Sequence, residues 1–405
     1  AEVISDVLDE KERLGCSLDN KRTIQKRLEG FRDTIINYPV NIYSVPEKAL
    51  QYDKSKDNFL EILENISEMF VRLNTTGTRI KLSDLVAAIL TAKARERIGV
   101  SFRNRIMEIV DQFDKKGWDI DEPILTRTYM VIATNKTNFK EAKEDLENLA
   151  SKAIIENLEK VSDALNRLIS LLDRELNIKS DKYLKSKYSL VTLAYYEYKR
   201  GPLRPEDVKA MKRWLVLSSF SKRYTGRLES DLREDIAKIR DGKSFKDIED
   251  FLTVKSIGKN LFDNSYDKEH LLTLLILLKD AYDLRTDALS RIGELKSSEL
   301  NVHHIFPIEV LKKVYGEEIK IGETKMDIET AADLAANITI ISKTANQQIE
   351  DKRPDEYLRN YSEEYLKTHC IPLDQELWKP KNYARFLEMR QKNLVEKINK
   401  IILHS

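Results

Sequence analysis

Glycine, proline and cysteine are all scarce in this chain of 405 residues. Its 12 Gly and 9 Pro are about half the usual usage, and 34% of its residues are charged, a composition that favours long helices over an all-β fold. Two cysteines, Cys16 and Cys370, cannot build a disulfide framework or a four-thiolate zinc site, so a reducing cytoplasm is the expected compartment. No apolar run approaches the roughly 20 residues that cross a bilayer, so the sequence predicts no membrane span.

Apolar and aromatic residues are plentiful enough for hydrophobic cores. The chain is 41% hydrophobic and holds 17 Tyr, 12 Phe and 3 Trp, whereas disordered chains lack such apolar area. The length suggests two or three globular domains. The net charge of only +1 hides local clusters, and clusters of Lys and Arg are what a nucleic acid requires.

Helical periodicity dominates the first three quarters of the chain. The stretch NYPVNIYSV suggests one short strand near the start, and residues 100–290 read as almost uninterrupted helix. The clearest amphipathic helix runs from Glu141 to Leu176, where leucines, isoleucines and valines recur every three to five residues. This part is expected to be a helical bundle or array.

The pattern changes near Ser297. The segment ELNVHHIFPIEV reads as a short strand entering a loop, and NITIIS at 337–342 reads as a second strand. A polar helix start, KTANQQIEDKR, follows the second strand directly. The predicted order is therefore strand, long connection, strand and helix, before a tail from Tyr357 to Ser405 that is again helical.

Two of the five histidines, His303 and His304, are adjacent within this β-type segment. Neighbouring side chains of a strand point to opposite faces, so the pair could be one buried and one exposed structural histidine. A bulge or a strand end could instead direct one ring at a metal and the other at a reacting water. The histidines at 270, 369 and 404 have no partners at ligand spacing, and we interpret them as structural.

The sequence around the pair supports the second interpretation. His303-His304-Ile-Phe-Pro is followed by Asn337 at the second strand and by Asn346, nine residues later, in the first turn of the helix. In order, spacing and context this resembles the HNH branch of the His-Me finger (ββα-metal) nucleases. The tail FLEMRQKNLVEKI is similar to the end of the subfamily that closes GmrSD-type modification-dependent restriction endonucleases.

The resemblance implies a role for each of these residues. His304 would be the general base, since a neutral imidazole with an ordinary pKa near 6.5 suits that task. His303 and Asn346 would bind the metal, and Asn337 would brace the loop bearing His304. A site with so few protein ligands would leave waters on the ion, as Mg²⁺ prefers, and a His ligand also admits Mn²⁺. Many relatives have Gly before the strand-opening Asn, where this chain has Ala336.

A second resemblance lies upstream. MFVRLNTTGTRIKLSDL is similar to the end of the ParB/sulfiredoxin-like domain that precedes the nuclease in GmrSD-type proteins. In that family the domain handles a nucleoside triphosphate and senses modified DNA through an Asp-Gly-Gln-Gln-Arg loop, which this chain lacks. We therefore expect residues 1–95 to be the C-terminal remnant of such a domain, either in a fragment of a longer protein, which the abrupt start favours, or in a member that has lost the loop. Arg72 and Asn74 could contribute to a nucleotide or DNA pocket, or could simply form a helix-to-helix turn.

Two basic segments are candidates for phosphate contact. Residues 211–227 hold five basic and no acidic residues with interleaved aromatics, including Lys222 and Arg223, although the same aromatics could form a buried helix face. Residues 377–405 hold seven Lys or Arg against two Glu. From this tract Arg385, Arg390 and Lys397 are the expected contacts.

Together these features predict a mainly α protein with a small α+β part: a remnant at 1–95, a helical domain at 96–290 and a ββα-metal (HNH) nuclease domain at 291–405. The expected function is metal-dependent cleavage of DNA in the restriction of foreign or phage DNA. The substrate could be modified duplex DNA. The alternatives are a non-catalytic helical DNA-binding or partner-docking module with an inactive HNH fold, and an RNase. A homodimer, or two successive events, would let one site per chain cut both strands.

Overall fold

The computed structural model describes residues 26–30, 32–33, 62, 86, 90–91, 102–248, 262, 264–287 and 289–400. The chain divides into two units, residues 1–77 and 78–405. In the first unit the described residues 26–30 and 32–33 are helical. The strand expected near the start, and most of the expected remnant at 1–95, lie outside the described residues.

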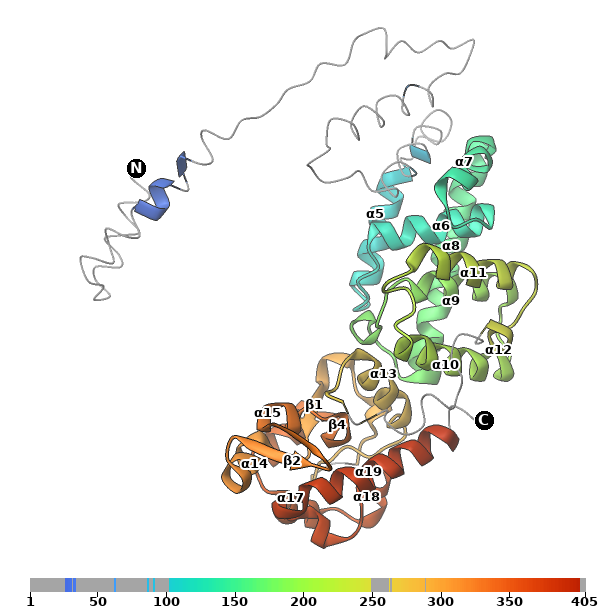
Figure 1. The fold of residues 1–405 in the computed structure, drawn as a ribbon. Helices are drawn as coiled ribbons and strands as arrows, with labels where there is room; N and C mark the ends of the chain where they lie inside the picture. The colour runs from blue at the N-terminus through green and yellow to red at the C-terminus, as the bar shows by residue number, and fades with distance from the viewer. Residues whose placement is uncertain are drawn as a thin grey trace, which may run out of the picture. The chain divides into compact units, whose positions relative to one another are not determined.

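The described residues from 102 to 248 form helices joined by short turns (Figure 1). The helices are α5 (Phe102–Asp114), α6 (Glu122–Thr134), α7 (Phe139–Asn148), α8 (Ser151–Leu176), α9 (Ser189–Arg200), α10 (Pro205–Phe220), α11 (Leu228–Arg240) and α12 (Phe245–Ile248), with a 3₁₀ turn, η2 (Asp181–Tyr183). The expected helical part is thus confirmed over this range.

Helix α9 lies at the centre of this helical part. Every residue from Ser189 to Glu197 is buried, because α6, α8 and α11 all pack against this helix. The buried carboxylate of Glu197 accepts two hydrogen bonds of 2.8 Å from the guanidinium group of Arg167. The single helix expected from Glu141 to Leu176 is in fact two, since α7 ends at Asn148 and α8 begins at Ser151.

The C-terminal part combines short helices with two small sheets. Its elements are α13 (Lys268–Leu277), η5 (Ile292–Glu294), η6 (Ser297–Glu299), β1 (Leu300–His304), α14 (Ile308–Tyr315), β2 (Glu318–Ile321), β3 (Thr324–Asp327), α15 (Ile328–Ala332), η7 (Ala335–Asn337), β4 (Ile338–Ser342), α16 (Lys343–Ile349), α17 (Pro354–Tyr357), η8 (Leu358–Asn360), α18 (Glu363–Thr368), η9 (Gln375–Trp378), η10 (Pro380–Asn382) and α19 (Tyr383–Ile398).

Strands β1 and β4 are the two predicted strands, and they pair antiparallel. The register places His303 opposite Thr339 and His304 opposite Ile338. The long connection between them holds α14, the hairpin of β2 and β3, and α15. The sequence pattern did not predict this hairpin, because most of its residues are exposed and give little apolar signal.

Helices pack against β4 and bury this strand, whereas β1 is only partly buried. All five residues of β4 are buried, and α13 and α16 both contact this strand. Helix α19 contacts η7, the turn that leads into β4. The described structure is therefore mainly helical with a small β part, as expected, and the β2–β3 sheet adds to the one sheet that was predicted. None of the helices described is long and apolar enough to cross a membrane.

Candidate active site

The two adjacent histidines lie at the C-terminal end of β1, where the strand opens into a loop. The side chain of His303 is buried, with 4% of its surface exposed. The side chain of His304 is 26% exposed. Both line one cleft, of about 510 Å³, together with Asn346 from α16. Because His304 is the last residue of the strand, the pair can share this cleft although strand neighbours normally face opposite ways.

His303 and Asn346 are in direct contact. Nδ1 of His303 donates a hydrogen bond of 2.7 Å to Oδ1 of Asn346. On the other side of the ring, Nε2 lies 3.5 Å from the hydroxyl oxygen of Tyr357, which itself donates to the carbonyl of Ile305. Burial lowers the pKa of His303 to about 4, against the opposing hydrogen bond to Asn346, so the ring is neutral near neutral pH.

Asn346 reaches this position because α16 starts directly after β4. Ser342 caps the helix, and its hydroxyl oxygen accepts a hydrogen bond of 2.9 Å from the backbone N–H of Ala345. The backbone N–H of Ser342 is held in turn by the buried carboxylate of Asp283, at 2.8 Å. The first turn of α16 is thus fixed beside the strand end.

His304 contacts a carboxylate. Its Nε2 donates a hydrogen bond of 2.7 Å to Oδ1 of Asp333, the residue that follows α15. The ring of Tyr266 packs edge-on against the imidazole, with ring centroids 6.3 Å apart. Nδ1 of His304 has no hydrogen-bond partner among the described residues, and it is the nitrogen left for a ligand or water.

Asn337 connects three backbone segments around the histidines. Its Oδ1 accepts from the N–H of Phe306 at 2.9 Å, while its Nδ2 donates to the carbonyls of Phe306 and Ala332 at 3.0 and 2.9 Å. Its own carbonyl accepts from the N–H of Ile305. These bonds fix the loop immediately after His304. Ala336, which precedes Asn337, does not have a positive φ angle, so the 3₁₀ turn there needs no glycine.

His303 and Asn346 are the residues of the cleft that could hold a cation. Among the described residues no three His, Cys, Asp or Glu side chains gather as a metal cluster, so a site here would rest on these two neutral ligands. The close contact of Nδ1 with Oδ1, and a ring that burial keeps deprotonated, suit joint coordination, because a metal-binding His must be neutral. Bound waters and phosphate oxygens would complete such a shell.

Two of the three cations expected from the C-terminal tract are not surface groups. Arg390 is completely buried in α19, and burial lowers its pKa to about 10. Its guanidinium donates to the carbonyl of Ala336 at 2.6 Å. Lys397 is half-buried, and its Nζ donates to the carbonyl of Thr368 at 2.7 Å. The expectation that Arg390 contacts phosphate is therefore wrong, and Lys397 is already engaged within the protein; only Arg385 is exposed.

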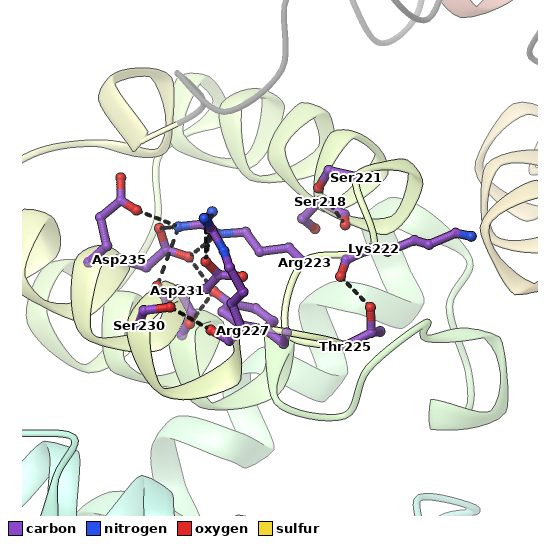
Figure 2. A network of polar contacts seen from close by, with 12 residues as sticks. Ser218, Ser221, Lys222, Arg223, Thr225, Arg227, Ser230, Asp231 and Asp235 are labelled. Carbon is purple, nitrogen blue, oxygen red and sulfur yellow. Dashed lines mark hydrogen bonds and ion pairs between the residues drawn. The ribbon is translucent and has the colours of Figure 1, made fainter.

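The basic segment 211–227 is largely core. Trp214 and Tyr224 are buried, as the alternative interpretation allowed. Arg223 is 5% exposed, and its guanidinium forms a pair of hydrogen bonds to Asp235, at 2.6 and 2.8 Å. Figure 2 shows Arg223 directed into this acidic network while Lys222 extends away from it. The expected phosphate contact at Arg223 is corrected to a buried ion pair, whereas Lys222 is exposed.

Three further predicted features have definite outcomes. Arg72 and Asn74 lie outside the described residues. His270 accepts the backbone N–H of Asp267 at the start of α13 and packs against Phe220, which fits a structural histidine. His369 is completely buried and bonds to Thr339 and to the carbonyl of Tyr282.

Sequence reasoning missed two residues that contact the histidines, Asp333 and Tyr357. Asp333 belongs to the long connection and Tyr357 to α17, and neither lies at a spacing that predicts contact with the histidines. The only signal for Asp333 was its position in the sequence, four residues before Asn337. For Tyr357 the sequence offered none.

The C-terminal part resembles a known protein family. Residues 253–397 match the family described as GmrSD restriction endonucleases, C-terminal domain. The match contains both histidines, Asn337 and Asn346, and it begins before the expected domain boundary at 291. An uncharacterized protein of Methanocaldococcus jannaschii, MJ0686, is 22% identical over 429 aligned residues, which cover 92% of this chain and 68% of that protein.

These similarities support a GmrSD-like nuclease. The matched family is the C-terminal domain of restriction endonucleases, so the match points to a nuclease with DNA as its substrate class. The similarity covers the part of the chain in which the cleft lies.

Proposed function

We propose that this protein is a metal-dependent DNA endonuclease of the HNH type, with its active site in the cleft of His303, His304 and Asn346. The observation that supports it best is the joint placement of these side chains: a histidine with one free ring nitrogen next to a buried His–Asn pair that could hold a cation. Phosphodiester hydrolysis needs such a base and such a cation.

In this mechanism His304 is the general base. Water gives a proton to Nδ1 of His304, and the hydroxide oxygen that results forms a bond to phosphorus. The bond from phosphorus to the leaving oxygen breaks, and that oxygen keeps the electron pair and takes a proton from solvent. Asn337 holds the loop after His304 through the bonds to Phe306, so the base keeps its place during the reaction.

His303 and Asn346 would hold Mg²⁺ or Mn²⁺. The bound cation would stabilise negative charge on the phosphate and on the leaving oxygen. The proton now on Nδ1 of His303 would move to Nε2. The resulting Nε2–H group can donate a hydrogen bond to the hydroxyl oxygen of Tyr357. The chain thus has a partner ready for the tautomer that metal binding requires.

The substrate strand needs cations near the cleft. A second groove, of about 480 Å³, lies on the other side of α14 and shares Asp351 with the active-site cleft. We call it the basic groove; its cations are Lys313, Arg353, Lys379 and Lys381. Arg353 is paired with Asp355 and Lys379 with Glu376. Lys313 and Lys381 are exposed and form no ion pair in the described part of the chain.

We assign phosphate contacts to Lys313 and Lys381, with Arg385 and Lys222 as further exposed candidates. The proposal extends to restriction of foreign or phage DNA in the cytoplasm, with a modified duplex as the target. A nucleoside triphosphate requirement would belong to a longer protein that carries the complete upstream domain. A homodimer would allow both strands to be cut in one encounter.

The decisive experiment is incubation of the purified chain with supercoiled plasmid, with and without Mg²⁺ or Mn²⁺. We expect metal-dependent nicking that His304→Ala reduces by about 10²-fold or more, since general-base catalysis is worth roughly 10²–10⁴-fold. The variant should keep its melting temperature, because His304 is partly exposed. A structured RNA in a parallel reaction tests for an RNase. Full activity of His304→Ala, or cleavage of RNA alone, would contradict the proposal.

A further inference from the structure

We propose that Asp333 is the positioning residue of His304: it holds the imidazole in the tautomer whose Nδ1 is free to accept a proton. The inference rests on the proposed role of His304 as a base and adds a residue that the sequence did not identify. It is carried by the hydrogen bond of 2.7 Å from Nε2 of His304 to Oδ1 of Asp333.

The chemistry of this bond determines where the imidazole proton lies. A carboxylate accepts hydrogen bonds and donates none, so the shared proton must reside on Nε2. A neutral imidazole carries a single N–H. Nδ1 of His304 therefore has a lone pair, and no described residue occupies it. An imidazole without this partner would divide its population between two tautomers, only one of which can accept a proton at Nδ1.

Asp333 is held in place independently of His304. Its backbone N–H donates to the carbonyl of Glu329 at 3.0 Å, which ends α15. Its backbone carbonyl accepts the N–H of Tyr266 at 2.8 Å, and the next residue, Leu334, bridges to Ser265. The carboxylate is thus presented from a backbone that is fixed on two sides.

The side-chain environment of Asp333 indicates that its bond to His304 orients the imidazole ring rather than stabilises the fold. Its side chain is 44% exposed and that of His304 is 26% exposed. Ion pairs between groups that are this exposed contribute little to folding stability. No lysine or arginine pairs with Asp333 in the described part of the chain, so its carboxylate is committed to His304.

A charged partner also stabilises the product of the proton transfer. When Nδ1 takes the proton of water, the ring becomes an imidazolium cation with N–H groups at both nitrogens. The carboxylate of Asp333 then faces a positive charge across a charge-assisted hydrogen bond, which is stronger than a neutral one. The same carboxylate thus serves the ring before and after the transfer.

The test compares Asp333→Asn with Asp333→Glu and with the control Asp280→Asn. An asparagine can donate from its amide to Nε2, which favours the tautomer with the proton on Nδ1. We expect Asp333→Asn to lower kcat for plasmid nicking by about 10²-fold or more, with KM within threefold, since the base is disabled and DNA contacts remain. Asp333→Glu should recover part of kcat. Asp280→Asn removes an exposed carboxylate that lines neither the active-site cleft nor the basic groove, and it should change kcat less than threefold.

A spectroscopic measurement separates this inference from the proposed function. The ring ¹⁵N shifts of His304, recorded on full-length histidine-labelled protein at pH 8 and assigned with His304→Gln, report the tautomer without metal or DNA. We expect the Nε2–H form in the parent protein and a shift toward the Nδ1–H form in Asp333→Asn. An unchanged tautomer would overturn the inference even if the variant were inactive. If the parent protein cut no DNA and the tautomer still changed, the positioning role would stand and the proposed function would fail.

Discussion

The amide oxygen of Asn346 accepts a hydrogen bond from Nδ1 of His303 across 2.7 Å, although the two residues lie 43 positions apart. The contact depends on the pairing of β1 with β4, which brings the start of α16 beside the end of β1. Neither side chain is charged near neutral pH. A cation held between them would gain no ion pairing from the protein, so substrate phosphate should strengthen binding substantially.

Substitution of Asn346 should therefore expose a weak, shared metal site. We expect Asn346→Ala to reduce cleavage strongly at low Mg²⁺, with partial recovery at high Mg²⁺ or with Mn²⁺, because one of two protein ligands is lost. His303→Ala should act on the same ion. The double variant should then lose less activity than the product of the two single effects. Metal titrations of cleavage, with calorimetry of metal binding to each variant, measure this; a fully multiplicative loss would show that the residues act independently.

Tyr357→Phe tests the tautomer of His303 that metal binding requires. The hydroxyl of Tyr357 lies 3.5 Å from Nε2 and donates to the carbonyl of Ile305. Without it, the metal-bound ring loses its hydrogen-bond acceptor, and outer partners of this kind are worth about 10–100-fold in metal affinity. Calorimetric titration with Mn²⁺ checks the expected loss. Tyr361→Phe removes a hydroxyl bonded to Leu284 instead, and is the control expected to leave metal affinity unchanged.

Local signals explain why the sequence predicted part of this site. His303, His304, Asn337 and Asn346 lie in or next to two short apolar strands and a capped helix start, and each of these patterns is readable over a few residues. The strands and the start of α16 are accordingly found where they were predicted. The functional roles of these residues stay predictions.

Residues brought in by long-range packing could not be predicted. Asp333 reaches His304 through a connection whose hairpin has little apolar patterning, and Tyr357 arrives from α17. Burial explains the opposite error. A count of basic residues treats every cation as exposed, but the buried Arg390 bonds to the carbonyl of Ala336 and the buried Arg223 to the carboxylate of Asp235. Tertiary structure alone decides which cations remain at the surface.

Buried histidines should make the stability of the C-terminal part sensitive to acid. Burial lowers the pKa of His369 to about 3, and the neutral ring bonds to Thr339 and to the carbonyl of Tyr282. Since the folded pKa lies below the ordinary value near 6.5, His369 binds its proton more readily in the unfolded chain. Its contribution to stability is therefore present above pH 6.5 and is lost as the pH falls toward 3.

The loss should amount to roughly 1.4 kcal/mol per pH unit, or about 2 kcal/mol at pH 5. The amide of His369→Gln can bond to the same two partners. Between pH 6.5 and 5, the slope of its unfolding free energy against pH should correspond to one proton fewer taken up on unfolding. Urea unfolding at several pH values measures this slope. His303 also has a lowered pKa and should keep part of the acid sensitivity in the variant. Equal slopes in the two proteins would show that His369 does not carry the effect.

The salt dependence of DNA binding tests which cations contact phosphate. Lys313 and Lys381 are exposed in the basic groove, which shares Asp351 with the active-site cleft. Each phosphate contact adds about 0.9 to the slope of log K against log salt. The double variant Lys313→Ala/Lys381→Ala should therefore lower this slope by about 2 in anisotropy titrations of a short duplex without metal. Lys320→Ala/Lys392→Ala, which removes two exposed lysines outside both clefts, is the matched control and should leave the slope unchanged. If both double variants lowered the slope equally, DNA would be attracted by overall charge alone, and the basic groove would not be the path of the substrate strand.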